Sequence, residues 1–206
     1  QVSKYEELIY VHELMHALQD QHFKLALFSD AENLSNDQLQ ALRGLAEGEA
    51  ELLQNLYLTG GYFDNAEAAE IQNELEQRLR ILADTQQRSE APEIWSESFL
   101  FAYEEGFLFA NELYSRFGWT GLNDAWDTLP TSTEQILHPD RYIDGDVPLN
   151  ISVVGVGDIL GANWVEIDDN VFGEFFLREY LSQQLDPAAV DQAATGWGGD
   201  RYVVYH

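Results

Sequence analysis

The sequence predicts a mainly α-helical protein, with minor β structure in the C-terminal third. Three observations support this fold class. Apolar residues recur at spacings of three and four over long stretches before residue 118. Beyond that point glycine and proline separate shorter elements, and β-branched residues concentrate in two short runs. No repeat or linker divides residues 1–206, so we expect a single domain, possibly an excerpt of a longer chain.

The first two predicted helices have clear apolar faces. One covers about residues 5–28, where apolar side chains recur at helical spacings at Leu8, Val11, Met15, Leu18 and Leu25. Ser35 or Asn36 can cap the second helix, because a short polar side chain accepts a hydrogen bond from the first turn. We expect this second helix to run to about Leu58.

Two more long helices are expected before the elements shorten. Residues 65–88 are rich in Glu and Gln, and their apolar face carries Ile71, Leu75, Leu79 and Leu82. The next helix begins near Pro92, which the first helical turn tolerates, and is rich in aromatic residues to about Phe117. Gly118 is expected to end it, since glycine readily adopts the left-handed conformation common after a helix.

The last third of the chain is predicted to contain short helices and two strands. The helices are expected within residues 120–129, 131–137, 170–185 and 186–196. The best strand candidate is "VPLNISVVG", residues 147–155, because it is rich in β-branched residues and bounded by turn formers. The final "RYVVYH" is also typical of a strand.

Composition excludes several classes of protein. The chain has no Cys, so a metal site must use His and carboxylate ligands, which suits Zn, Mn or Fe. No run of about 18 apolar residues is present, so we expect no membrane insertion. The net charge of -27 would repel nucleic acid and anionic membranes. We expect this acidity to serve solubility, as in proteins from salty media; a cationic substrate or partner is the alternative.

The segment "YVHELMHALQDQHF" contains the motif H-E-x-x-H at His12, Glu13 and His16. Residues four apart lie on one face of a helix, so both imidazoles can bind one ion. Glu13 would lie beside that ion, where a carboxylate can accept the proton of a metal-bound water. The alternative is a pair of histidines on a half-buried helix face.

The second predicted helix offers a third ligand in "LAEGEAELL". With H-E-x-x-H upstream, this segment resembles the gluzincin metallopeptidases, whose third zinc ligand is a Glu followed by G-x-A. The resemblance covers about residues 5–58. It implies a zincin-like domain that binds Zn2+ through His12, His16 and Glu47, with Glu13 as general base and a peptide or protein substrate. It also implies that Glu51 orients a ligand histidine.

Helical periodicity alone favours a different third ligand. On a helical wheel with Leu39 at an angle of zero and about 100° between successive residues, the apolar residues of this helix cluster around roughly 300°. Glu49 then falls near about 280°, inside the apolar cluster, whereas Glu47 falls near about 80°, beside Arg43. The resemblance favours Glu47, because only that choice leaves Gly48 and Ala50 in the G-x-A positions. We expect Gly48 to let the ligand helix approach the histidine helix closely.

Gluzincins also use a downstream Tyr or His to stabilise the oxyanion. The candidates here are His138 and Tyr142, with Tyr103 as a third possibility. Each of them could instead be a packing or capping residue, and His138 could simply pair with Glu134 four residues earlier. His22 is expected to be a surface residue.

The predicted function is zinc-dependent hydrolysis of peptide bonds. Two alternatives remain open: a gluzincin-like protein that binds metal or partners without catalysis, and a helical domain without metal. The chain begins with Gln, shows no signal peptide, and enters the histidine helix almost at once. Since gluzincins place a sheet before that helix, we expect that sequence is missing upstream.

Overall fold

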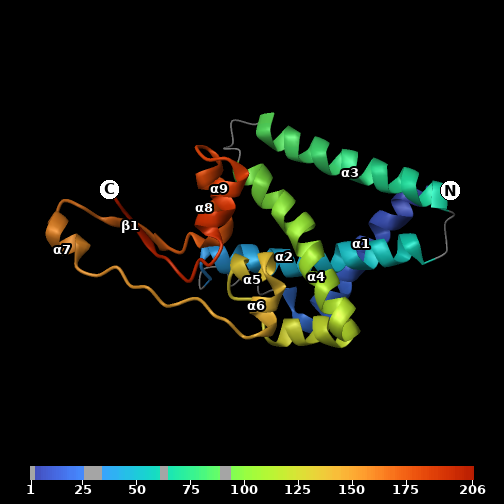
Figure 1. Cartoon of the computed structure of the whole chain (residues 1–206), viewed down its shortest axis with the longest axis horizontal. Coiled ribbons are helices and arrows are strands. Elements are labelled where there is room, and N and C mark those ends of the chain that lie inside the picture. Colours follow the sequence, from blue (N-terminus) through green and yellow to red (C-terminus); the bar gives the residue numbers. More distant parts are fainter. Residues whose placement is uncertain (1–2, 26–33, 61–64, 89–93) are drawn as a thin grey trace. The chain divides into compact units, whose positions relative to one another are not determined.

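The computed structural model describes residues 3–25, 34–60, 65–88 and 94–206, and it confirms the predicted fold class (Figure 1). Long helices dominate, and a two-stranded antiparallel sheet lies in the C-terminal third. The elements are α1 (Lys4–Phe23), α2 (Asn36–Thr59), α3 (Asn65–Arg88), α4 (Ile94–Asp127), α5 (Thr133–Leu137), α6 (Pro139–Ile143), α7 (Val156–Leu160), β1 (Glu166–Asn170), α8 (Gly173–Ser182), α9 (Pro187–Ala194) and β2 (Tyr202–Tyr205).

The chain forms two compact units. The first contains residues 1–29 and 42–129, and the second contains residues 30–41 and 130–206. Helix α2 therefore begins in the second unit and continues through the first. In the described residues, no helix is long and apolar enough to cross a membrane.

Local sequence explains where α1 begins and which face it buries. The Ser3 hydroxyl accepts from the Glu6 N–H at 3.2 Å, and the Glu6 carboxylate accepts from the Ser3 N–H at 2.7 Å. This reciprocal cap satisfies two amide groups that the first turn leaves unpaired. The buried residues of α1 recur at helical spacings and include two polar ones: Leu8, His12, Met15 and Gln19. Helix α1 thus buries the first motif histidine along with its apolar stripe.

Glycines allow α2 and α4 to approach very closely. A Cβ added to Gly48 would lie 2.0 Å from the Gly106 carbonyl oxygen, and one added to Gly106 would lie 2.3 Å from the Gly44 carbonyl oxygen. No side chain larger than hydrogen fits at either position without separating the two backbones. The expectation that Gly48 brings α2 against α1 is therefore wrong, because the glycine faces α4.

Part of the remaining packing of the first unit uses the predicted apolar faces, although Leu18, expected on the apolar face of α1, is 39% exposed. Ile71 of α3 joins Leu8 of α1 and Leu58 of α2 in a buried cluster. Helix α4 is broken at Gly118, where φ is 65° and ψ is -159°, so the glycine ends the first helical segment as expected. The second segment buries Leu122, Ala125 and Trp126.

The second unit contains the sheet, but the best strand candidate is wrong. Residues 147–155 form no strand, and β1 instead covers the acidic segment Glu166–Asn170. This strand pairs with β2, which lies in the predicted "RYVVYH". An ion pair between Asp169 and Arg201, at 2.6 Å, offsets the poor strand propensity of the acidic residues. Pairing of β1 with β2 thus outweighed the low strand propensity of the β1 residues.

The core of the second unit contains a buried carboxyl group. Asp37 of α2 is 1% exposed and accepts hydrogen bonds from the Thr133 amide at 3.1 Å and from the Thr133 hydroxyl. Gly173, at the start of α8, has a φ of 81°, and a Cβ there would lie 1.9 Å from Asp37 Oδ1. Only glycine therefore fits beside this carboxyl group.

Candidate metal centre

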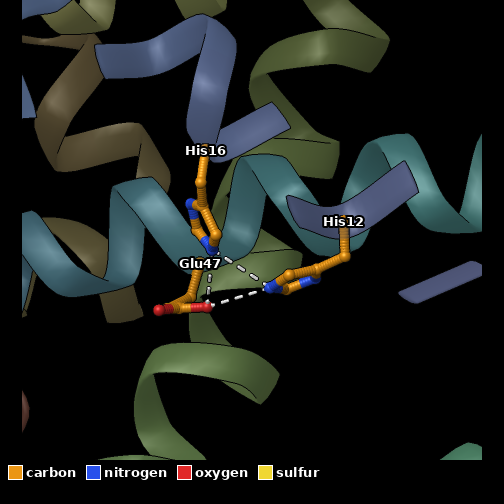
Figure 2. Close-up of side chains that lie close together, drawn as sticks. All are labelled: His12, His16 and Glu47. Atoms are coloured by element: carbon orange, nitrogen blue, oxygen red, sulfur yellow. Dashed lines mark hydrogen bonds and ion pairs between the residues drawn. The ribbon is translucent and has the colours of Figure 1, made fainter. Parts of the chain in front are cut away.

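The two motif histidines lie on one face of α1 and point to the same place (Figure 2). Their Nε2 atoms are 3.1 Å apart. His12 is buried and His16 is partly buried, which the four-residue spacing on the inward face explains. Local helical geometry alone is sufficient to bring the two imidazoles together.

Glu47 of α2 completes a group of three possible metal ligands. Its Oε2 atom lies 3.3 Å from His12 Nε2 and 3.4 Å from His16 Nε2. Among the described residues, this is the only group of three His, Asp or Glu side chains close enough to hold one metal ion. Glu47 Oε2 is buried and makes no hydrogen bond of normal geometry within the described structure. Such an atom is stabilised by a nearby hydrogen-bond donor or cation.

The three distances fit a tetrahedral zinc site. Two ligand atoms bound to one tetrahedral zinc ion at about 2.0–2.1 Å lie roughly 3.3 Å apart. The observed separations are 3.1, 3.3 and 3.4 Å. Two imidazoles and one carboxylate also form a common ligand set of catalytic zinc, which keeps a fourth position for water. The residues present therefore fit a zinc ion in number, type and spacing.

The other nitrogen of each histidine faces an acceptor. His12 Nδ1 lies 3.3 Å from Glu51 Oε1, and His16 Nδ1 lies 2.8 Å from Gln19 Oε1. Each acceptor favours a proton on Nδ1, so the lone pair of each neutral ring is on Nε2. Two nitrogen lone pairs and a carboxylate oxygen then converge on one point, where they repel one another unless a proton or a metal cation is shared between them.

Gln19 is held in one orientation by a deeper hydrogen-bond relay. Its amide nitrogen donates to the Ala46 carbonyl oxygen at 3.0 Å and to Glu49 Oε2 at 2.9 Å, so both donors are used. A flipped amide would place its oxygen against these two acceptors, so the oxygen must face His16. Glu49 Oε2 also accepts from Trp126 Nε1 at 2.7 Å. We call Gln19, Glu49 and Trp126 the Gln19 relay.

The electrostatics of the site favour positive charge at the two Nε2 atoms. Burial lowers the pKa of His12, but the carboxylates of Glu47 and Glu51 outweigh burial and raise the pKa to about 9. Burial likewise opposes ionisation of Glu47, yet the two imidazoles lower its pKa to about 2. The pKa of His16 is also raised, mainly by Glu47 against the effect of burial. Protons and a metal cation would therefore compete for the same atoms.

The structure separates the two candidates for the third ligand. Glu47 faces both histidines, as the resemblance implied, whereas Glu49 faces Gln19 and Trp126. Helical periodicity correctly indicated that Glu49 is buried, since it is 3% exposed. Burial of a carboxylate did not, however, identify its partner. Glu51 lies beside His12, where the resemblance placed it.

Glu13 and Tyr103 border the site from α1 and α4. Glu13 is exposed and lines a cavity of about 200 Å³ together with His12 and Tyr103. The Tyr103 ring stacks on His12, with centroids 5.9 Å apart and planes 5° from parallel. Burial, followed by the charge of Glu47, raises the pKa of the Tyr103 phenol, so its O–H proton is firmly held. Tyr103 is thus an oxyanion candidate that contacts His12 directly.

The other two oxyanion candidates lie in the second unit. His138 Nε2 is 3.0 Å from Glu174 Oε1, so this ring already has a buried carboxylate partner. Tyr142 lies in α6. A role for either residue at the metal site stays a prediction. His22 is exposed at the end of α1, as expected.

Gln19 and Trp126 were not predicted from the sequence. Nothing in the sequence distinguishes a glutamine that orients a histidine from any other, and only its spacing of three from His16 places it nearby.

Comparison with known proteins adds no further assignment: no known protein family matches the chain, and neither a curated protein nor a solved structure is significantly similar to it.

Proposed function

We propose that this protein is a zinc-dependent metallopeptidase, with zinc held by His12, His16 and Glu47. One observation carries the proposal: three ligand atoms at tetrahedral spacing converge from two helices, and the motif glutamate follows the first histidine directly. A zinc ion bound here would lower the pKa of a water molecule and polarise a substrate carbonyl.

The protein side chains have separate roles in this proposal. Glu51 and the Gln19 relay orient the two imidazoles. Glu13 accepts the proton of the attacking water and passes it to the leaving amine. Its exposed carboxylate lines the cavity beside His12. Tyr103 retains its proton and can donate a hydrogen bond to the developing oxyanion.

Two measurements test the proposal. Elemental analysis of the full chain after zinc loading and washing should give one zinc per molecule. Glu13→Gln should retain that zinc and lose about 100-fold or more in hydrolysis of a peptide library, because an amide cannot accept the proton. Zinc absent from the wild-type protein, or lost with Glu13→Gln, would contradict the assignment.

A protein that binds metal without catalysis is the second candidate. One observation favours it: the described part of the first unit contains no strand beside the site that could pair with an extended peptide. This candidate predicts full zinc occupancy in the wild-type chain, together with no hydrolysis of any library peptide and no difference between wild type and Glu13→Gln.

A further inference from the structure

A second cavity adjoins the metal centre on the side of Glu47. Its volume is about 450 Å³, and its walls include Arg43, Glu47 and the aromatic residues Trp95, Phe99 and Tyr103. Arg43 and Glu47 are four residues apart on α2, so both lie on one face of the helix. Tyr103 lines this cavity as well as the one that contains Glu13. A substrate at the metal could therefore place an adjacent group beside Arg43.

Arg43 is an available cation in a strongly acidic chain. Among the described residues it forms no ion pair, although the chain contains 37 acidic residues. Glu47, which lies one turn away, directs its carboxylate toward the histidines instead. Most other described arginines are paired with an acid: Arg78, Arg116, Arg141, Arg178 and Arg201. The Arg43 side chain is exposed, so a ligand can reach it.

We infer that this cavity binds a carboxylate group of the peptide substrate, through Arg43. The inference rests on the proposed peptidase function and adds the class of substrate. The carboxylate can come from an acidic side chain or from the C-terminus of the peptide.

The chemistry of the cavity favours this ligand. A guanidinium presents a planar fork of donors that matches a carboxylate, and charge-assisted hydrogen bonds of this kind are strong. The aromatic walls can accommodate an apolar or aromatic neighbour of the carboxylate. The acidic surface elsewhere repels an anionic group over about a Debye length, roughly 10 Å at 0.1 M salt. Arg43 therefore provides a local attraction within a repulsive surface.

A binding experiment tests the subsite without requiring hydrolysis. The probes are 3-phenylpropanoate, which carries a ring and a carboxylate, and the neutral 3-phenylpropanamide, each titrated into the zinc-loaded full chain. We expect the wild type to bind the acid more tightly than the amide. Arg43→Gln should weaken acid binding by about twofold to fivefold, as for the loss of an exposed ion pair, and leave amide binding unchanged. Arg116→Gln is the matched control, since it removes one positive charge from an exposed ion pair on α4.

Peptides identify the source of the carboxylate. One set compares Glu with Gln at each position, and a second compares a free C-terminus with an amidated one. Whichever carboxylate Arg43 recognises should raise kcat/KM in the wild type and in Arg116→Gln but not in Arg43→Gln.

Three results would overturn the inference: equal binding of the two probes, an acid affinity that Arg43→Gln leaves unchanged, or loss of zinc from Arg43→Gln. The last would show that Arg43 supports Glu47 rather than the substrate. Failure of the peptidase proposal itself would appear differently, as absent zinc or as hydrolysis that Glu13→Gln does not reduce.

Discussion

Replacing Gln19 tests whether the hydrogen-bond relay controls the metal site. Gln19→Met retains an unbranched side chain of similar length but removes the acceptor 2.8 Å from His16 Nδ1. Without that acceptor, His16 can place its proton on Nε2, the atom proposed to bind zinc. Loss of a group that orients a ligand histidine typically costs about 10- to 100-fold in metal affinity, or about 1.4 to 2.8 kcal/mol.

The same substitution should also destabilise the metal-free protein. Glu49 is 3% exposed and would lose one of its two donors, leaving only Trp126 Nε1. A buried acceptor left partly unsatisfied costs about 1–3 kcal/mol. Trp126→Phe retains a ring at that position. It removes the donor to Glu49 but leaves the Gln19 acceptor of His16 in place, so its effect on zinc affinity should be smaller than that of Gln19→Met.

Two assays separate orientation from general destabilisation. Zinc affinity is measured by competition with a chromophoric chelator at a pH where each variant is fully folded. The nitrogen NMR shifts of His16 in metal-free protein report which nitrogen carries the proton when they are recorded at a pH high enough that both rings are neutral, and the His12 shifts serve as an internal reference. Gln72→Met, on the exposed side of α3, is the matched control. If Gln19→Met binds zinc like the wild type, or if His16 keeps its Nδ1 proton, the relay does not position the ligand.

Glu47→Ala should release zinc, whereas Glu49→Ala should weaken binding only through Gln19; release by the Glu49 change alone would show that the ligand is misassigned. Burial raises the pKa of Asp37 from 3.8 to about 7, against the opposing effect of its Thr133 hydrogen bonds, so the folded state binds more protons than the unfolded state between those values. Stability should therefore fall as pH rises from about 4 to 7, by up to a few kcal/mol, and denaturant titrations of Asp37→Asn should show a flatter pH dependence. Gly48→Ala should cost at least about 1–3 kcal/mol and lower Tm, because its Cβ would meet the Gly106 carbonyl, whereas Gly198→Ala, with open space around it, should leave Tm nearly unchanged. Molar salt should raise Tm by screening repulsion among the acidic side chains, and a flat or falling Tm would contradict that explanation.

Local periodicity was sufficient to predict much of this protein. The mainly helical class follows from apolar spacing. The break at Gly118 follows from its residue type, because glycine readily adopts the positive φ found there. The juxtaposition of His12 and His16 also follows from sequence, because four residues always bring side chains onto one helical face. These features depend on geometry within a single helix.

Tertiary structure decided the features that depend on two segments. Periodicity placed Glu49 in the buried face of α2, and it is buried, but only the rotation of α2 against α1 shows that Glu47 meets the histidines. Gly48 was expected to face α1 and instead contacts α4, since a glycine offers no side chain whose polarity indicates its neighbour.

The same limit explains the strand that was wrongly predicted. Residues 147–155 have the composition of a strand, and the Leu149 N–H donates to the Gly198 carbonyl oxygen at 2.8 Å, but in the described structure they form no strand, whereas the acidic residues of β1 pair with β2. A strand is stabilised by hydrogen bonds to another segment, so its own composition is weak evidence. Within one helix the sequence determines which side chains share a face. Between elements, the register and rotation of packing are decided by the whole fold, because they depend on every contact that the packed surfaces make at once.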